Sequence, residues 1–96
     1  MARTPIHHGE TLAERLDELE RSAAELARVL GVPPSRITRI LNGKGGVTPD
    51  TALRLGRFFG NDPFFWLNLQ QTYQLRLAEQ RVGVEIERTV VPRTAA

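Results

Sequence analysis

Apolar and polar residues alternate along this chain with the spacing of short amphipathic helices. Leu12, Leu16 and Leu19 recur at intervals of four and three residues, which places them on one stripe of a helix. Later stretches keep this period, and most begin at serine, threonine, aspartate or proline and end near glycine. We therefore expect an all-α chain whose helices cover residues 9–19, 22–30, 34–42, 48–60 and 62–79.

The second and third of these helices are joined by a tight turn. Gly31 stands where a left-handed residue ends the second helix, a conformation that glycine adopts without steric cost. Val32 fills the turn, and Pro34 suits the first position of the third helix because its missing N–H has no partner there. Ala27 is small where the two helices must cross. The segment 23–42 therefore predicts a helix-turn-helix.

The third helix has one apolar and one polar side. Ile37 and Ile40 are three residues apart, so they share a face that packs onto the second helix. The other positions carry small, hydrogen-bonding or cationic side chains, the kind that contact base edges and phosphates. Two helices and a turn also occur in helical domains that never bind DNA, so the prediction of DNA binding depends on the whole pattern. The candidate contacts are Pro34, Ser35, Arg36, Thr38 and Arg39, of which we expect Ser35 and Arg39 to read bases.

The glycine-rich loop after the third helix is a candidate phosphate site. Residues 42–46 lack the spacing of a nucleotide-binding loop, so we expect the backbone amides around Gly43 to meet a DNA phosphate instead. The start of the second helix would supply further contacts, since helix N-termini attract phosphate. The phosphate-contacting candidates are Ser22, Ala23, Asn42, Gly43 and Lys44.

The predicted helix over 62–79 is the most aromatic segment, and its apolar surface is wider than a five-helix core of this size needs. A single helix-turn-helix of this size covers too little DNA for tight specific binding, so we expect a homodimer on a palindromic operator. The candidate dimer contacts are Phe65, Trp66, Leu69 and Tyr73.

The pattern changes after Glu79. Residues 82–87 alternate apolar and polar side chains, which fits a short strand, and residues 88–96 have the composition of a frayed tail. We therefore divide the 96 residues into a DNA-binding domain over 1–79 and a C-terminal extension over 80–96.

Composition excludes several classes of function. The chain has no cysteine, so it forms no disulfide and has no catalytic thiol. Its two histidines, His7 and His8, are adjacent and no carboxylate pair completes a metal site, so we expect neither enzyme activity nor a cofactor or metal. No apolar run approaches the ~20 residues of a membrane span, and the N-terminus lacks the apolar core of a signal peptide. A cytoplasmic location follows as an expectation.

The net charge of +2 is weak evidence for nucleic-acid binding, but its distribution is more informative. Residues 1–21 carry three arginines against five carboxylates, whereas residues 22–60 carry six basic residues against two carboxylates. The positive charge therefore lies on the helix-turn-helix and the segment after it, where counterions would be released from DNA.

Three segments resemble one known family. IHHGETL is similar to a His-Pro-Gly-Glu-hydrophobic opening, GVPPSRITRILNGKGGVTPDTALRLGRFFG to a helix-turn-helix with its following helix, and DPFFWLNLQQTYQL to a Pro-x-Phe-Trp-Leu-Asn-Leu-Gln signature. Together they resemble the lambda-repressor/Cro-like DNA-binding domains over residues 6–79, and within them the HigA-type (VapI-like) antitoxins. The resemblance implies a compact five-helix domain with a short C-terminal tail or strand.

The resemblance also implies a function. Such a protein would be the antitoxin of a type II toxin–antitoxin module, would neutralise a RelE-like ribonuclease toxin, and would repress its own operon as a homodimer. A stand-alone repressor without a toxin, and an interaction module whose helix-turn-helix no longer binds DNA, are the alternatives.

This chain departs from the family pattern at three places. His8 replaces a proline, which is expected to loosen the start of the first helix. Glu20 and Arg21 replace Gly-Leu, so the first helix is expected to run on. Ala23 stands where a phosphate-contacting glutamine is common, so one phosphate contact is expected to be missing.

Overall fold

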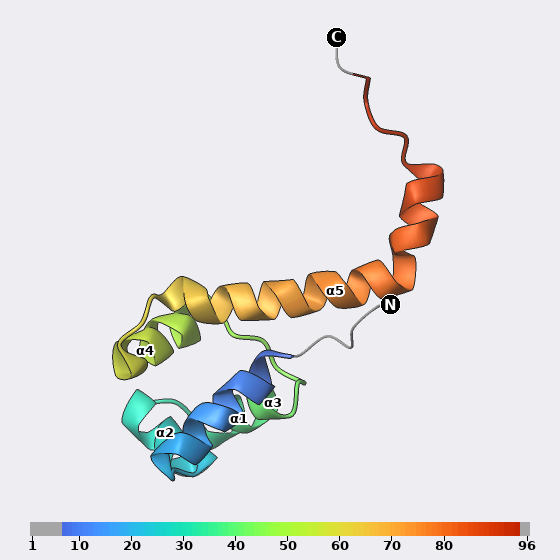
Figure 1. Ribbon diagram of the computed structural model, residues 1–96. Helices are drawn as coiled ribbons and strands as arrows, with labels where there is room; N and C mark the ends of the chain where they lie inside the picture. The colour runs from blue at the N-terminus through green and yellow to red at the C-terminus, as the bar shows by residue number, and fades with distance from the viewer. Residues whose placement is uncertain (1–6, 95–96) are drawn as a thin grey trace.

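The computed structural model describes residues 7–94, and within that range the chain forms five helices and no strand (Figure 1). The expected all-α, five-helix, lambda-repressor-like fold is confirmed. Residues 1–6 of the expected domain and residues 95–96 of the expected extension lie outside the described residues. The helices are α1 (His8–Leu19), α2 (Ala23–Leu30), α3 (Pro34–Leu41), α4 (Pro49–Phe59) and α5 (Pro63–Thr89).

Most helix ends lie where the sequence places them. Ser22 and Glu25 form a reciprocal capping box at the start of α2, and Thr48 caps α4 by accepting a hydrogen bond from the N–H of Thr51. Gly31 and Gly60 end α2 and α4 in the left-handed conformation, with φ of 74° and 73°. Side-chain caps and glycine stops thus set most of the helix boundaries.

The end of α1 agrees with the helix expected over 9–19, but not with the run-on expected from the family departure at Glu20 and Arg21. Glu20 adopts the left-handed conformation at φ 54°, so the helix stops at Leu19 and does not run on. The N–H of Glu20 donates to the carbonyl of Asp17 (3.1 Å), and that of Arg21 donates to the carbonyl of Leu16 (3.0 Å). These two bonds close the helix as a glycine cap would, although a non-glycine residue in this conformation costs roughly 1 kcal/mol.

One core joins all five helices. Leu19, which the sequence pattern places on the apolar stripe of the first helix, is exposed instead, and Leu53 of α4 is 62% exposed. The buried apolar side chains are Leu12, Leu16, Leu26, Ala27, Leu30, Val32, Ile37, Ile40, Val47, Ala52, Leu55 and Trp66.

The helix α5 plays two structural roles. Its first half packs on α4 and α1, and Gln70 holds the segment before α4 by bonding both the N–H and the carbonyl of Val47. Its second half leaves the domain, and the helix bends before its last turns (Figure 1). No helix among residues 7–94 is long and apolar enough to cross a membrane.

The predicted strand over 82–87 is wrong, because these residues continue α5 to Thr89. The alternation of Val82, Val84 and Ile86 therefore distributes apolar side chains around a helix, and all three are exposed. No other strand exists in the described range to pair with such a segment, whereas a helix satisfies its backbone internally. The helix predicted over 62–79 is accordingly longer, and only residues 90–94 of the described extension follow it.

Candidate nucleic-acid interface

The helix α3 presents its polar side to solvent because its apolar side is anchored. Ile37 and Ile40 are fully buried against the other helices. Pro34 occupies the first helical position, as expected, and Pro33 precedes it as the N-cap. All five candidate contacts of this helix are exposed, namely Pro34, Ser35, Arg36, Thr38 and Arg39. The structure thus brings them together on one outward face.

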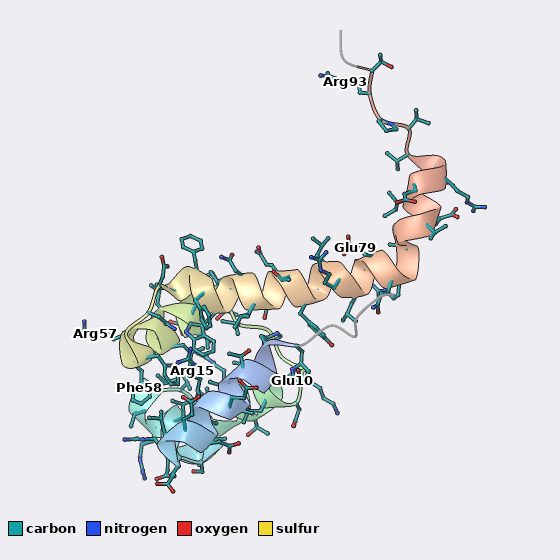
Figure 2. All side chains as sticks on the ribbon, viewed as in Figure 1. Glu10, Arg15, Arg57, Phe58, Glu79 and Arg93 are labelled. Carbon is teal, nitrogen blue, oxygen red and sulfur yellow. The ribbon has the colours of Figure 1, made fainter. Side chains whose placement is uncertain are left out.

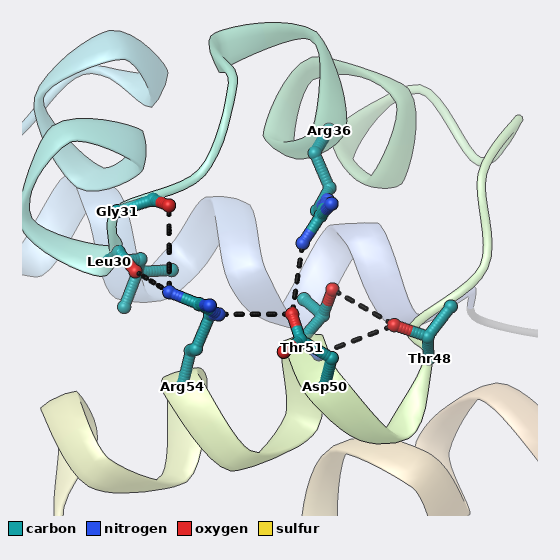
Figure 3. Close-up of polar contacts among 7 residues, drawn as sticks. All are labelled: Leu30, Gly31, Arg36, Thr48, Asp50, Thr51 and Arg54. Atoms are coloured by element: carbon teal, nitrogen blue, oxygen red, sulfur yellow. Dashed lines mark hydrogen bonds and ion pairs between the residues drawn. The ribbon is translucent and has the colours of Figure 1, made fainter.

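Two ion pairs link α3 to α4, and a hydrogen bond continues this chain of contacts to α2 (Figure 3). Arg36 Nη1 and Arg54 Nε each lie 3.0 Å from the same oxygen, Oδ2 of Asp50. Arg54 Nη1 also donates to the carbonyl oxygen of Leu30 (2.7 Å), at the end of α2. The hydrogen bond from Arg54, together with the charges of both guanidinium groups, holds the pKa of Asp50 below its ordinary value.

Sequence reasoning did not identify Asp50 or Arg54 as part of the site. Their spacing of four residues along α4 is a signal for an ion pair within one helix. The link to Arg36, however, depends on how α3 packs against α4, and no local pattern shows it.

Thr38 and Arg39 are tied to backbone nearby. The hydroxyl of Thr38 donates to the carbonyl of Pro34 one turn earlier (3.1 Å). Arg39 Nη2 lies 3.5 Å from the carbonyl oxygen of Lys44, in the loop after α3. Position 45 requires glycine, because a Cβ at this position would lie 2.8 Å from Cβ of Arg39. The guanidinium of Arg39 thus borders the glycine-rich loop.

The backbone amides of Gly43, Lys44 and Gly45 in that loop already donate to carbonyls of α3. The N–H of Gly43 donates to the carbonyl of Ile40 (3.0 Å), and the N–H groups of Lys44 and Gly45 both donate to the carbonyl of Arg39 (2.9 and 3.0 Å). The expectation that amides around Gly43 hold a phosphate is therefore wrong, because these donors close the end of α3. The loop offers the exposed side chains of Asn42 and Lys44 instead.

The two N-terminal histidines hold this loop from the other side. Nε2 of His8 donates to the carbonyl oxygen of Gly45 (3.0 Å). The ring of His7 lies beside Gly43, since a Cβ added at position 43 would be 3.5 Å from Nδ1 of His7. His7 is the N-cap of α1, accepting from the N–H of Gly9 (3.0 Å). The helix begins at His8 itself, so the replacement of proline there does not loosen its start as expected.

The start of α2 is partly occupied by its own capping box. The N–H of Ser22 donates to Glu25 Oε1 (2.8 Å), and the N–H of Glu25 donates to Oγ of Ser22 (3.1 Å). The backbone N–H of Ser22 is the main cause that lowers the pKa of Glu25. Ala23, half-buried against the core, follows at the first helical position, where its N–H has no partner within the helix.

The expected dimer contacts face their own domain. Trp66 is only 1% exposed, and its Nε1 donates to Oδ1 of Asn61 (3.0 Å), so its assignment to a surface is wrong. Phe65, Leu69 and Tyr73 are half-buried. The large apolar side chains that α5 does expose are Phe64, Leu75, Val82, Val84 and Ile86.

Figure 2 shows the same division of α5. Side chains crowd the space between α1, α4 and the first half of the helix, whereas beyond Glu79 they stand apart from the domain. Apart from Phe64, the excess apolar surface that the sequence indicates therefore lies further along α5 than residues 65–73.

Known proteins share this sequence and fold. The family model for the helix-turn-helix matches residues 12–66. Virulence-associated protein I of Dichelobacter nodosus is 51% identical over 76 residues, which is 78% of this chain and 70% of that protein. A HigA-family addiction module antidote protein from Coxiella burnetii is 50% identical, with a TM-score of 0.93 over 95% of this chain and 100% of that one.

A third similar protein was solved together with DNA. The Pseudomonas aeruginosa antitoxin HigA with the higBA promoter is 41% identical, with a TM-score of 0.89 over 94% of this chain and 99% of that one. Family model, sequence relatives and solved structures agree with the five-helix geometry described above. The chain belongs to the helix-turn-helix family and, within it, to the HigA-type (VapI-like) antitoxins.

Proposed function

We propose that this chain is a sequence-specific DNA-binding antitoxin that represses its own operon as a homodimer and neutralises a RelE-like ribonuclease toxin in the cytoplasm. The observation that carries the proposal is the outward face of α3, on which Ser35, Arg36, Thr38 and Arg39 are exposed while Ile37 and Ile40 anchor the helix. The similar antitoxin HigA with its promoter DNA supports the same role.

The proposed binding mode places α3 in the major groove with its N-terminal residues toward the base edges. Ser35 and Arg39 read bases, and Arg36 and Thr38 contact bases or phosphates. The side chains of Asn42 and Lys44 hold the backbone on one side of the helix. The start of α2, at Ser22 and Ala23, holds it on the other.

The homodimer follows from the need to read two half-sites, whose centres would lie ~34 Å apart or a multiple of that. The structure favours the second half of α5 as its surface, where Leu75, Val82 and Ile86 recur at intervals of seven and four residues and are all exposed. This spacing forms one apolar stripe along a helix, as a two-helix contact requires. The half-buried Phe65, Leu69 and Tyr73 would contribute at most their exposed edges.

The repressor function is tested with the DNA that precedes the gene. The protein is titrated onto that duplex and onto a scrambled duplex of equal length, at several salt concentrations. A repressor binds the first more tightly, and its affinity falls as salt rises. Equal, negligible binding to both duplexes would favour the interaction module whose helix-turn-helix no longer binds DNA.

The antitoxin function is tested with the neighbouring reading frames. Each is expressed alone and then together with this chain, and growth and messenger RNA integrity are followed. A toxin partner arrests growth alone, degrades RNA, and is silenced and co-purified by this chain. If no neighbouring product is toxic or binds, while operator binding is intact, the chain is a stand-alone repressor.

A further inference from the structure

Arg36 lies in the first turn of α3, the part of the helix that faces the bases in the proposed function. Its guanidinium is nonetheless not free in solution, because Nη1 lies 3.0 Å from Oδ2 of Asp50 in the first turn of α4. In Figure 3 the side chain of Arg36 leaves α3 and points toward α4. The carboxylate therefore fixes the direction in which this cation is presented.

Asp50 is itself held in place. Arg54 Nε lies 3.0 Å from the same carboxylate oxygen, and the spacing of four residues makes this an ion pair within one helix turn. Arg54 is in turn fixed by the carbonyl oxygen of Leu30 at 2.7 Å. The carboxylate of Asp50 is ionised at neutral pH, as an ordinary aspartate is, and the hydrogen bond from Arg54 and the charges of Arg54 and Arg36 lower its pKa further. Three helices thus determine where the negative charge beside Arg36 stands.

The position of that charge affects specific and nonspecific DNA binding differently. A free arginine reaches any nearby phosphate and raises the affinity for every DNA sequence alike. A guanidinium whose one N–H is held by a carboxylate keeps four further donors in a fixed plane, and it has less net attraction for phosphate. Fixed donors discriminate between base edges, because only one base presents matching acceptors.

The ion pair between Arg36 and Asp50 contributes little to the stability of the fold. The side chains of Arg36 and Asp50 are 41% and 57% exposed. Ion pairs this open to solvent contribute little to stability, because water screens them and ordering the side chains costs entropy. The core residues Ile37 and Leu55 hold α3 and α4 without it.

We propose that Asp50 is a specificity-determining residue, which acts by positioning Arg36 for a base edge and by withholding it from phosphates. The proposal rests on the proposed DNA-binding function. It adds an acidic residue outside the helix-turn-helix to the groups that set which operator is chosen.

The experiment starts from a random duplex library, from which the wild-type protein selects its preferred sequence. Three variants select from the same library: Asp50→Asn, Arg36→Ala and the double variant. Asparagine keeps the size of the side chain and removes its charge. Glu85→Gln is the matched control, since it removes one equally exposed carboxylate from an ion pair with Arg88 on α5, off the apolar stripe of the proposed dimer surface. Dissociation constants for the selected and a scrambled duplex are then measured at several salt concentrations.

We expect Asp50→Asn to lower the ratio of operator to scrambled affinity about tenfold, chiefly by tightening scrambled binding, and to steepen the salt dependence. We expect Asp50→Asn to lose the same base preference that Arg36→Ala loses. The double variant discriminates no worse than Arg36→Ala alone, because the aspartate acts only through the arginine. Glu85→Gln retains the wild-type ratio.

Two results would overturn this role for Asp50 alone. The first is that Asp50→Asn selects the wild-type sequence and keeps the wild-type ratio of operator to scrambled affinity. The second is that the effects of Asp50→Asn and Arg36→Ala on this ratio are fully additive in the double variant. A third result would also exclude the proposal: Asp50→Asn binds both duplexes equally more weakly and unfolds at a lower midpoint. The ion pair between Arg36 and Asp50 would then have a structural role. If the wild type itself selects no sequence, the proposed function fails first, and this inference fails with it.

Discussion

Nε2 of His8 lies 3.0 Å from the carbonyl oxygen of Gly45, 37 residues further along the chain. A carbonyl only accepts, so Nε2 of His8 is the donor in this bond. His8 is buried, and its Nδ1 has no hydrogen-bond partner among the described residues. The first turn of α1 therefore fixes the loop that follows the proposed recognition helix.

Replacing His8 by alanine removes this bond and leaves the half-buried carbonyl of Gly45 without its partner. We expect the free energy of unfolding to fall by about 1–3 kcal/mol, measured by urea denaturation. Glu10→Gln, an exposed change in the same helical turn, is the control and should be nearly neutral. Wild-type stability in His8→Ala would show that the bond contributes nothing.

Arg39→Ala tests base reading. We expect the affinity for the selected operator to fall by ~1–3 kcal/mol and the preference at one base pair to relax. Because Arg39 also borders the loop at Lys44, circular dichroism and unfolding are measured in parallel. Unchanged affinity together with an unchanged selected sequence would refute the assignment of Arg39 to a base.

Lys44→Ala tests phosphate contact. Its exposed ammonium forms no ion pair among the described residues, so its charge is available to DNA. We expect all duplexes to be weakened alike and the slope of affinity against salt to fall by ~1. A loss confined to the operator, with the slope intact, would contradict this assignment.

Val82→Glu tests the proposed homodimer surface, and Val84→Glu is its control. Both side chains are exposed on α5, but two residues apart on a helix they point to nearly opposite sides. We expect only Val82→Glu to shift sedimentation toward the monomer and to abolish cooperative binding to a palindrome. A dimer that survives Val82→Glu would place the contact elsewhere, and a monomeric wild type would end the dimer proposal.

Glu25→Gln tests the capping box through its pH dependence. The folded-state pKa of Glu25 is below its ordinary value of 4.5, mainly because its carboxylate accepts from the backbone N–H of Ser22. The resulting stabilisation is present above the unfolded-state pKa and is lost as pH falls through the lower folded-state pKa. We expect the variant to be less stable than wild type at neutral pH and equal to it in strong acid. A pH-independent difference would show that the charge is not involved.

Local chemistry in the sequence predicts most of the helix boundaries. Ser22, Thr48 and Asp62 cap helices, and Gly31 and Gly60 end them, because each effect acts within a few residues. The apolar stripe over 9–19 also predicts the end of α1, but the left-handed conformation of Glu20 that closes the helix was not predictable, since glutamate rarely adopts it.

The longer-range features depended on the packed structure. The alternation over 82–87 fits a strand, and only the lack of a partner strand and the continuation of α5 decide for a helix. Trp66 belongs to the core because α5 crosses α4 and α1 with that face, which its period alone does not reveal. The candidate face on α3 was predictable, whereas its partner Asp50 was not, because their contact spans 14 residues.

The bond from the Thr38 hydroxyl to the carbonyl of Pro34 fixes the polarity of that side chain. A hydroxyl whose proton is used in this way offers only lone pairs to any further group. In the major groove such an acceptor matches the exocyclic amino groups of adenine and cytosine, and it is unfavourable against the O6 and N7 of guanine. Serine at this position could make the same bond but lacks the methyl group that contacts thymine. In the proposed binding mode, position 38 would therefore discriminate through both ends of a small side chain, an acceptor oxygen and an apolar carbon.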